Sequence, residues 1–243
     1  MATAIITGGS QGLGRELAQA LAELEWRVVI DGRDREALDA AAAQLGDRVV
    51  AIAGDVTDPA HREELVRVAS AAGDLHLLVN NASTLGPTPM PALADYPLDA
   101  WRDVFETNVV APLALIQLVL PHLVPGSGRI VDITSDAGVE GYEGWGGYGS
   151  SKAALEQLTN VLAAEHPDLT VHRVDPGDMR TRMHQDAFPG EDISDRPPPA
   201  ASVPGLLALI LGEYPSGRYV ARDVADVADA AEGADDPQVE VAP

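Results

Sequence analysis

Short apolar runs alternate with longer segments of helical pattern along most of this chain. The apolar runs are Ala4–Thr7, Arg27–Ile30, Val49–Ala53, Leu75–Asn80, Arg129–Thr134 and Leu169–Val174. Apolar residues recur at helical spacing in the segments between them, which are Gly14–Leu24, Asp34–Leu45, Pro59–Ala71, Leu98 to about Leu123, and Tyr148–Glu165. Strands and helices in strict alternation form parallel sheets with right-handed crossovers. We therefore expect a single-domain α/β fold, a doubly wound parallel sheet with helices on both faces.

Length, charge and residue usage exclude several classes of protein. A chain of 243 residues suits one large domain with a substantial core. It contains no cysteine, which excludes disulfides, thiolate metal sites and cysteine nucleophiles. Its formal net charge of −22 repels nucleic acid and anionic membrane surfaces. No cluster of residues suggests a metal site, and we expect His122 and His184 to be surface or lid residues.

Neither a membrane span nor a secretion signal is expected. No uninterrupted apolar run approaches the roughly 20 residues that cross a bilayer. The N-terminal residues lack a basic region and lead directly into the first apolar run. We therefore expect a cytoplasmic protein.

Two stretches depart from the alternation of strands and helices. Residues 178–204 are rich in Pro and Asp and contain no clear strand, which favours a lid over a ligand crevice. After Arg222 the chain contains seven acidic residues and no basic one. We expect the folded domain to span residues 1–222 and residues 223–243 to form an acidic, disordered tail.

A glycine-rich turn follows the first apolar run. Its residues are Thr7-Gly8-Gly9-Ser10-Gln11-Gly12-Leu13-Gly14. The glycines allow a tight turn and a close approach to a pyrophosphate, and the following helix offers unpaired N–H groups and the positive end of its dipole. A merely tight turn is the plainer alternative, but the position between a first strand and a first helix favours dinucleotide binding in a Rossmann-like sheet. The expected cofactor contacts here are Gly8, Ser10, Gln11, Gly12, Leu13 and Gly14.

Polar motifs follow the later strands as well. Asp55-Val56 follows the third apolar run, Asn80-Asn81-Ala82 the fourth, Ser135 the fifth, and Pro176-Gly177 with Thr181 the sixth. The carboxyl ends of parallel strands lie at one edge of a sheet, where such sheets bind ligands. We therefore expect all of these motifs to converge on one crevice.

The only lysine of the chain, Lys152, lies four residues after Tyr148. On a helix these side chains share one face, about 5–6 Å apart at their Cβ atoms. At about 4 Å and an effective dielectric near 20, their attraction would be worth roughly 4 kcal/mol. That attraction would lower the pKa of the tyrosine from about 10 to near 7 and make it a proton donor and acceptor. A chance pair on a helix surface is the alternative.

These motifs together resemble the short-chain dehydrogenase/reductase family, in its compact single-domain branch. The resemblance covers roughly residues 2 to 181 and includes Thr7-Gly8-x-x-x-Gly12-x-Gly14, Asp55, Asn80-Asn81-Ala82, Asn108, Ser135 and Tyr148-x-x-x-Lys152. Ser135 precedes Tyr148 by thirteen residues, a spacing typical of the family. The resemblance implies an NAD(P)(H)-dependent oxidoreductase that interconverts a ketone or aldehyde and an alcohol.

The resemblance also implies the roles of the catalytic residues. Tyr148 would exchange a proton with the carbonyl oxygen, and Ser135 would polarise that carbonyl. Lys152 would bind the nicotinamide ribose and lower the pKa of the phenol. Asn108 would hold a water that links Lys152 to solvent, with a satisfied core polar group as the alternative.

Further residues would bind the cofactor if the resemblance holds. Asp55 and Val56 would contact adenine, and Asn80, Asn81 and Ala82 would line the cofactor cleft. Thr181, after Pro176 and Gly177, would bond the carboxamide, unless it is an ordinary helix cap.

The end of the second apolar run bears on the choice between NADP(H) and NAD(H). Gly32 occupies the position where NAD-selective members carry an acidic residue, and Arg33 the position of an NADP-selective basic residue. Asp31 adds negative charge nearby, and Gln11 is neutral where NADP enzymes often carry a basic residue. We expect NADP(H), with Arg33 as a cofactor contact.

The substrate walls are expected at residues 84–101, residues 136–147 and the lid at 178–204. The second wall carries Asp136, Glu140 and Glu143, so we expect a neutral carbonyl or alcohol substrate.

Ser83 stands where the family most often has glycine. The C-terminus departs from the family pattern, in which a strand and a glycine-rich segment commonly pack between subunits. A homodimer through the long helix and the Tyr148 helix is expected, and a tetramer is in doubt.

Two other functions remain open from the sequence. One is a catalytically silent NAD(P)-binding sensor or scaffold, which would need only the glycine turn. The other is a redox-assisted epimerase or dehydratase, which the chain length and the glycine spacing disfavour.

Overall fold

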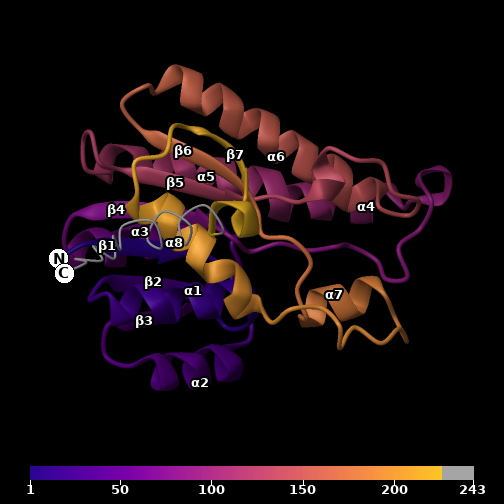
Figure 1. The fold of residues 1–243 in the computed structure, drawn as a ribbon, viewed down its shortest axis with the longest axis horizontal. Helices are drawn as coiled ribbons and strands as arrows, with labels where there is room; N and C mark the ends of the chain where they lie inside the picture. Colours follow the sequence, from indigo (N-terminus) through magenta and orange to yellow (C-terminus); the bar gives the residue numbers. More distant parts are fainter. Residues whose placement is uncertain (226–243) are drawn as a thin grey trace, which may run out of the picture.

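A seven-stranded parallel sheet forms the centre of the molecule (Figure 1). The computed structural model describes residues 1–225. The strands are β1 (Thr3–Ile6), β2 (Arg27–Gly32), β3 (Val49–Ala53), β4 (Leu75–Asn80), β5 (Arg129–Ile133), β6 (Thr170–Asp175) and β7 (Gly217–Val220). Their order is β3-β2-β1-β4-β5-β6-β7, and every neighbouring pair is parallel. The expected doubly wound α/β fold is confirmed.

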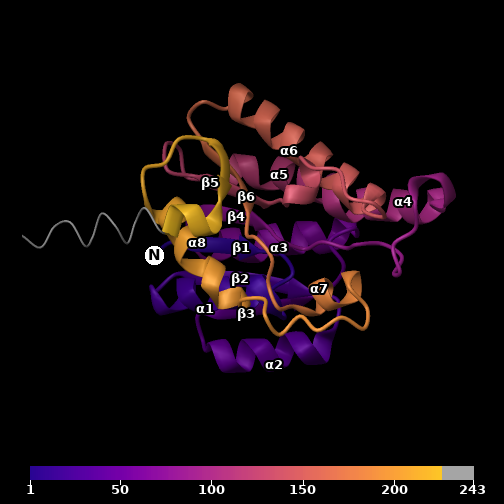
Figure 2. The same ribbon diagram turned by 45° about the vertical axis from the view of Figure 1, so that its right-hand side comes forward.

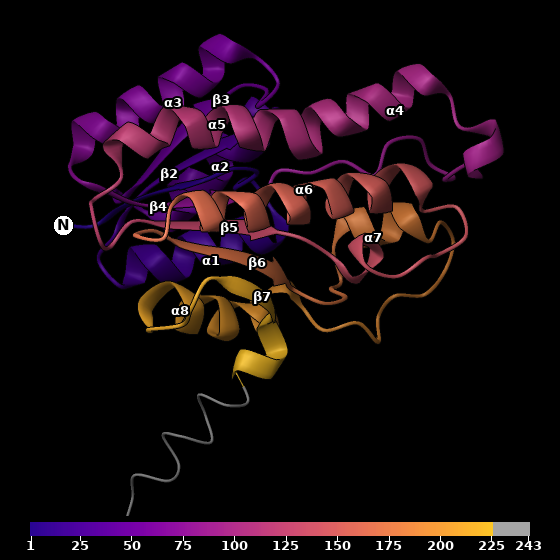
Figure 3. The same ribbon diagram turned by 90° about the horizontal axis from the view of Figure 1, so that it is seen from above.

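Helices cover both faces of this sheet (Figure 3). The helices are α1 (Gly12–Glu23), α2 (Arg35–Leu45), α3 (Pro59–Ala72), α4 (Leu98–Phe105), α5 (Ala111–Val119), α6 (Gly146–Glu165), α7 (Arg182–Ala187) and α8 (Val203–Leu211). One layer contains α1, α2 and α8, and the other contains α3, α5 and α6. Asp34 and Asp58 cap α2 and α3, where their side chains accept bonds from the N–H groups of Ala37 and Ala60.

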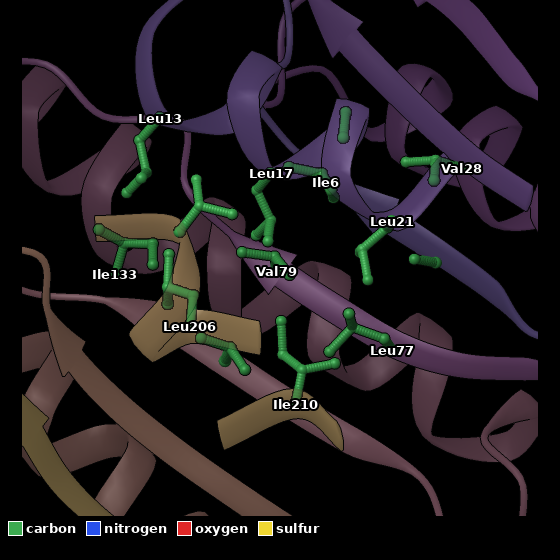
Figure 4. Close-up of a cluster of buried hydrophobic side chains, with 14 of the residues drawn as sticks. Ile6, Leu13, Leu17, Leu21, Val28, Leu77, Val79, Ile133, Leu206 and Ile210 are labelled. Carbon is green, nitrogen blue, oxygen red and sulfur yellow. The ribbon is translucent and has the colours of Figure 1, made fainter. Parts of the chain in front are cut away.

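Each layer of helices encloses its own hydrophobic core. Ile6 and Val79 face α1 and α8, where they meet Leu17 and Leu206 (Figure 4). Ile5, the neighbour of Ile6 in β1, belongs to the second core. Successive side chains of a strand point to opposite faces, so a strand covered on both faces is apolar throughout. This requirement explains why the strands are continuous apolar runs in the sequence.

The strand order reverses beside β1, which pairs with β2 on one side and β4 on the other. The crossovers leave this point in opposite directions and open a crevice at the carboxyl ends of the strands. The short helix α7 lies beyond that end of the sheet (Figures 1 and 2). The fold therefore places a ligand crevice where the polar motifs end their strands.

The long helical segment between β4 and β5 is interrupted rather than simply bent. A π turn at Glu106–Val110 separates α4 from α5, and Pro112 lies in the first turn of α5. A proline cannot donate to the carbonyl four residues earlier and clashes with it, so the irregular turn precedes it. By length and composition the segment Leu98–His122 could cross a membrane, but here it packs beside α3 and α6 as a covering helix.

The C-terminal part differs most from the sequence expectation. The segment 178–204, expected as a loop, contains α7 and a short 3-10 turn at Pro199–Ser202, and α8 and β7 follow it. Val224 is buried in the first core, two residues beyond the expected domain boundary at 222. Most of the predicted acidic tail, residues 226–243, lies outside the described residues.

Candidate active site

A cavity of about 430 Å³ opens at the carboxyl ends of the strands. Its volume lies in the usual range for cofactor and ligand sites, roughly 300–1,000 Å³. Most of the residues predicted to bind the cofactor line it: Gly8, Ser10, Gln11, Gly12, Leu13, Arg33, Asp55, Val56, Asn81, Ala82, Tyr148, Lys152 and Thr181. The convergence inferred from the strand ends is therefore found in the structure.

The glycine turn is shaped to leave its backbone exposed to this cavity. Gly12 has φ +58°, a left-handed conformation that favours glycine. A Cβ on Gly14 would lie 2.5 Å from the carbonyl oxygen of Gly8, so this residue does not line the cavity but lets α1 approach the turn. Gln11 caps α1 without a side-chain hydrogen bond, which leaves N–H groups of the first turn for a ligand. This cradle fits the pyrophosphate of a dinucleotide.

The end of β4 supports the glycine turn through side chains. Thr7 Oγ1 accepts bonds from the N–H groups of Asn81 and Ala82, both at 3.0 Å. Asn81 Nδ2 donates to the carbonyl oxygens of Thr7 and Gly8 at 2.8 and 3.2 Å. Asn80, by contrast, is buried and donates to Asp132 Oδ1 at 2.7 Å. The prediction that Asn80 lines the cofactor cleft is wrong, because its side chain lies inside the sheet.

The two charged residues at the end of β2 are placed differently. Asp31 is 1% exposed, and its carboxylate accepts bonds from Gly8 N–H at 2.7 Å and pairs with His61 Nε2 at 3.0 Å. Arg33 is exposed and lines the cavity. The pKa of Asp55 is lowered: burial raises it, but hydrogen bonds from Thr57 and the charges of Arg33 and His61 outweigh burial. Arg33 and Asp31 thus both line the cavity, but the Asp31 carboxylate is held by Gly8 and His61.

Tyr148 and Lys152 share the buried face of α6. They are 8% and 2% exposed, and Lys152 Nζ lies 5.5 Å from the centroid of the tyrosine ring. The ammonium donates to the carbonyl oxygen of Ile133 at 2.7 Å. The alternative of a chance surface pair is therefore excluded.

The predicted lowering of the pKa of Tyr148 is wrong for this structure. Burial raises that pKa well above its ordinary value, the charges of Asp175 and Asp136 raise it further, and hydrogen bonds from Ser135 and Ser83 oppose the change. Burial also lowers the pKa of Lys152 to about 8, against the charge of Asp132. The physical reason is the burial of the phenol, and the Lys152 ammonium, which donates to the carbonyl oxygen of Ile133, does not offset it.

Ser135 lies beside the tyrosine hydroxyl at the end of β5. Its Oγ accepts from Ala137 N–H at 3.2 Å and donates to Asp136 Oδ1 at 2.9 Å. It also lies near enough to the phenol of Tyr148 to lower the pKa of that phenol. Ser135 and Tyr148 thus place two hydroxyl groups near one another.

Asn108 is buried in the π turn, where its amide is fully used by the protein. Oδ1 accepts from Ser83 Oγ at 3.2 Å and from Thr84 N–H at 2.9 Å. Nδ2 donates to the carbonyl oxygen of Thr84 and to Ser151 Oγ, both at 2.9 Å. An amide group has two acceptor and two donor positions, and all four are filled. The side chain therefore matches the alternative of a satisfied core polar group and has no position left for the predicted water.

The remaining motif residues have structural roles. Pro176 and Gly177 do not line the cavity, and Gly177 N–H donates to Asp175 Oδ1 at 2.9 Å. Thr181 lines the cavity and also caps α7, where its Oγ1 accepts from His184 N–H at 3.2 Å. Sequence reasoning missed several lining residues, which are Glu16, Asp31, Gly32, Gly54, Ser83, Thr107, Ile133, Met179, Arg180, Arg182, Met183 and Pro199. Among these residues, the sequence pattern pointed only to those that lie in the lid or at the strand ends.

An apolar cluster includes Tyr148. Leu85 and Ala137 form it with Tyr148, and the partly buried side chains of Met90, Trp145, Met183 and Ala187 pack against it. The Trp145 ring lies 5.8 Å from the Tyr148 ring and 5.8 Å from Phe188. Three segments, including α7 of the lid, therefore supply apolar surface beside the phenol.

The family model described as short chain dehydrogenase matches residues 2–192. A rhamnolipid-biosynthesis 3-oxoacyl-[acyl-carrier-protein] reductase of Pseudomonas aeruginosa is 34% identical, and the match covers 90% of this chain and 94% of the reductase. A serine 3-dehydrogenase of Rhizobium radiobacter is 32% identical over 74% of this chain and 73% of its own length.

Solved structures agree with these sequence matches. A short chain dehydrogenase from Shigella flexneri, solved in complex with NADP, superposes with a TM-score of 0.83 at 29% identity and covers 91% of this chain and 97% of its own. A short chain dehydrogenase from Escherichia coli CFT073, solved with NADPH, also has a TM-score of 0.83 at 29% identity, with 91% and 96% coverage. The chain therefore belongs to the short chain dehydrogenase family of oxidoreductases.

Proposed function

We propose that this protein interconverts a neutral ketone or aldehyde and the corresponding alcohol with NADP(H), using Tyr148 as general acid and base. One observation carries the proposal: Tyr148, Lys152 and the glycine turn line one cavity, and Ser135 lies near enough to the phenol to lower its pKa. The nicotinamide, when bound, would supply or accept the hydride. The protein's own residues would manage the proton and the carbonyl oxygen.

The proton step would use the two adjacent hydroxyl groups. A phenol with a raised pKa is protonated at neutral pH, so Tyr148 is ready to give its proton to a carbonyl oxygen in the reductive direction. Ser135 Oγ–H, which donates to Asp136, would turn to donate to the same oxygen and stabilise the charge that develops there.

Lys152 would hold the cofactor ribose and stabilise the deprotonated phenol. Its buried ammonium lies beside the tyrosine ring, and the buried carboxyl of Asp132 provides charge of opposite sign. Asp132 accepts bonds from Asn80 Nδ2 at 2.7 Å and from Thr159 Oγ1 at 2.6 Å, which fix it behind the cavity. Asn80 and Thr159 would thus position the group that faces Lys152.

The preference for NADP(H) rests on Arg33 and Asp31. An arginine at this position can pair with the 2′-phosphate, whereas an NAD-selective site needs a carboxylate that accepts the ribose hydroxyls. Asp31 and Arg33 both line the cavity, but the carboxylate of Asp31 is already used by Gly8 and His61, which leaves Arg33 as the charged group at the end of β2 that is available to a ligand. The solved relatives in complex with NADP and NADPH support the same preference.

A neutral substrate suits the surroundings of Tyr148. The inner wall is the apolar cluster around Leu85 and Trp145. Farther out, the Tyr142 hydroxyl donates to Asp136 at 3.0 Å or Glu140 at 3.1 Å, and hydrogen bonds with these carboxylates, Asp136 first, raise the pKa of Tyr142 to about 12. This wall would repel an anionic substrate. Efficient reduction of a small keto acid but not of its ester contradicts this part of the proposal.

We also propose a cytoplasmic homodimer. Apolar side chains are exposed on the helices expected to pair, with exposures of 67% for Leu98, 44% for Val110, 38% for Leu113 and 44% for Val161. Burying such a surface against a second copy would remove apolar area from water. Sedimentation of the wild type and of Val161→Asp tests this part, because a monomer in both contradicts it.

A catalytically silent NADP-binding sensor is the competing function. It would need the glycine turn but not the hydroxyl groups of Ser135 and Tyr148. A panel of neutral ketones, assayed by the loss of NADPH absorbance, separates the two functions. Turnover by the wild type supports the enzyme, and tight NADPH binding without turnover of any ketone or alcohol supports the sensor.

A further inference from the structure

Ser83 occupies a position between the catalytic tyrosine and the π turn. It follows β4 and Asn81-Ala82, is half-buried and lines the cavity together with Tyr148. The sequence marked it only as a departure from the glycine common in the family. Its hydroxyl donates to Asn108 Oδ1, a bond that a glycine could not make, and it lies near enough to the phenol of Tyr148 to lower the pKa of that phenol.

The contact with Asn108 links Ser83 to the catalytic helix. Ser83 Oγ donates to Asn108 Oδ1 at 3.2 Å, and Asn108 Nδ2 donates to Ser151 Oγ at 2.9 Å. Ser151 Oγ in turn donates to the backbone carbonyl of Tyr148 at 2.6 Å. Asn108 and Ser151 are 1% and 0% exposed, so both anchors are buried. A chain of hydrogen bonds therefore runs from Ser83 through Asn108 and Ser151 to the backbone of Tyr148.

We infer that Ser83 is a positioning residue for Tyr148, and that its hydroxyl turns from Asn108 to the phenol oxygen when the phenol loses its proton. The inference rests on the proposed function for the event that removes this proton. Ser135 lies against the same oxygen but also has to serve the substrate carbonyl. Ser83 follows β4 and has no proposed role at the substrate carbonyl.

The proton count is consistent with this exchange. While Tyr148 is protonated, Ser83 O–H donates to Asn108 and its oxygen can accept from the phenol. After the phenol proton has moved to the substrate oxygen, Ser83 keeps its own proton and turns it toward the phenolate. Asn108 Oδ1 is not left unpaired, because Thr84 N–H still donates to it at 2.9 Å. Hydrogen bonds to a charged oxygen are stronger than neutral ones, so the turn is favourable.

Other charges face the same phenol and have to stay constant in any test. They are Asp136 in the β5–α6 segment, Asp175 at the end of β6 and Lys152 on α6. A substitution at Ser83 changes none of these charges.

Ser83→Ala and Ser83→Gly remove the hydroxyl, Ser83→Thr keeps it, and Ser150→Ala serves as the matched control. Ser150 is exposed on α6, and its hydroxyl donates only to Gly147 of its own helix.

The direct test titrates position 148 in the ligand-free protein. Difluorotyrosine, a more acidic phenol, is incorporated at position 148, and its fluorine NMR shift is followed against pH. Loss of the Ser83 hydroxyl is expected to raise the titration midpoint by about one pH unit, the size of one hydrogen bond to a charged acceptor. Ser83→Thr and Ser150→Ala are expected to keep the parent midpoint. An unchanged midpoint in both Ser83→Ala and Ser83→Gly overturns the inference.

Steady-state assays with NADPH and a neutral ketone separate this inference from the proposed function. If the wild type turns over and Ser83→Ala keeps both its kcat and its titration midpoint, Ser83 has no positioning role and the enzyme proposal stands. If no ketone is turned over but the midpoint shifts, the role of Ser83 stands and the proposed function fails. A kcat about tenfold lower in Ser83→Ala, restored by Ser83→Thr, supports both.

Discussion

The carboxylate of Asp31 accepts a hydrogen bond from the backbone N–H of Gly8 at 2.7 Å. The last residues of β2 thereby hold the first glycine of the cofactor turn after β1. The same carboxylate pairs with His61 of α3 at 3.0 Å, so three elements meet at one buried group. The glycine turn is thus fixed by a side chain that its own motif does not contain.

Removal of this carboxylate is expected to weaken both the fold and the cofactor site. Asp31→Ala leaves the partly buried N–H of Gly8 and the His61 ring without their acceptor, and an unsatisfied buried group costs about 1–3 kcal/mol. Urea unfolding measures the loss, and NADPH titration is expected to give a higher Kd. Asp39→Ala, an exposed position on α2, is the control. Equal free energies of unfolding for the two variants would show that the Asp31 contacts do not stabilise the fold.

Arg33 is expected to control the choice of cofactor. Arg33→Ala removes the cation proposed to pair with the 2′-phosphate, and a hydrogen bond to a charged group contributes about 1.5–3 kcal/mol. The kcat/KM with NADPH should therefore fall roughly 10- to 100-fold, while the value with NADH changes little. Arg35→Ala, exposed on α2, is the matched control. A wild type that prefers NADH tenfold refutes the cofactor assignment.

Lys152 is expected to make stability depend on pH in the alkaline range. Burial lowers its pKa from 10.5 to about 8 in the folded protein. Between these two values the unfolded chain binds more protons than the folded one, so the free energy of unfolding rises with pH. Compared with Lys152→Met, the wild type should gain stability from about pH 8 to about pH 10.5. Urea unfolding at several pH values measures the difference, and a constant difference contradicts the burial of the ammonium.

Most of the sheet could be predicted from the sequence because its strands are buried on both faces. The expected runs Val49–Ala53 and Leu75–Asn80 coincide with β3 and β4. The edge strand β7 was not identified, because Gly217 and Arg218 interrupt its apolar pattern and none of its four residues is fully buried. Helix α8 was hidden by the prolines around it, since Pro204 lies in its first turn, where proline is tolerated.

The sequence predicted which residues form the site better than it predicted their pKa values and contacts. Strand ends and glycine spacing identified the residues of the cavity, because parallel topology brings these positions together. The sequence did not show which of Asn80 and Asn81 faces the cavity. Successive residues at a strand end face opposite ways, and the pattern alone does not say which of them faces the ligand. The pKa of Tyr148 was missed for another reason: a spacing of four residues predicts a shared face but not the burial that raises this pKa. Asp31 looked like a competing charge because its partners, Gly8 and His61, are distant in sequence.

The most direct test of the account compares the wild type with Tyr148→Phe, which removes the phenol oxygen and keeps the ring beside Trp145 and Lys152. NADPH binding is measured by titration and ketone reduction by steady-state assay. General acid catalysis contributes about 10²–10⁴-fold, so kcat should fall by roughly a thousandfold while the Kd for NADPH stays the same. A Tyr148→Phe variant that reduces the ketone at the wild-type rate would show that this phenol does not supply the proton.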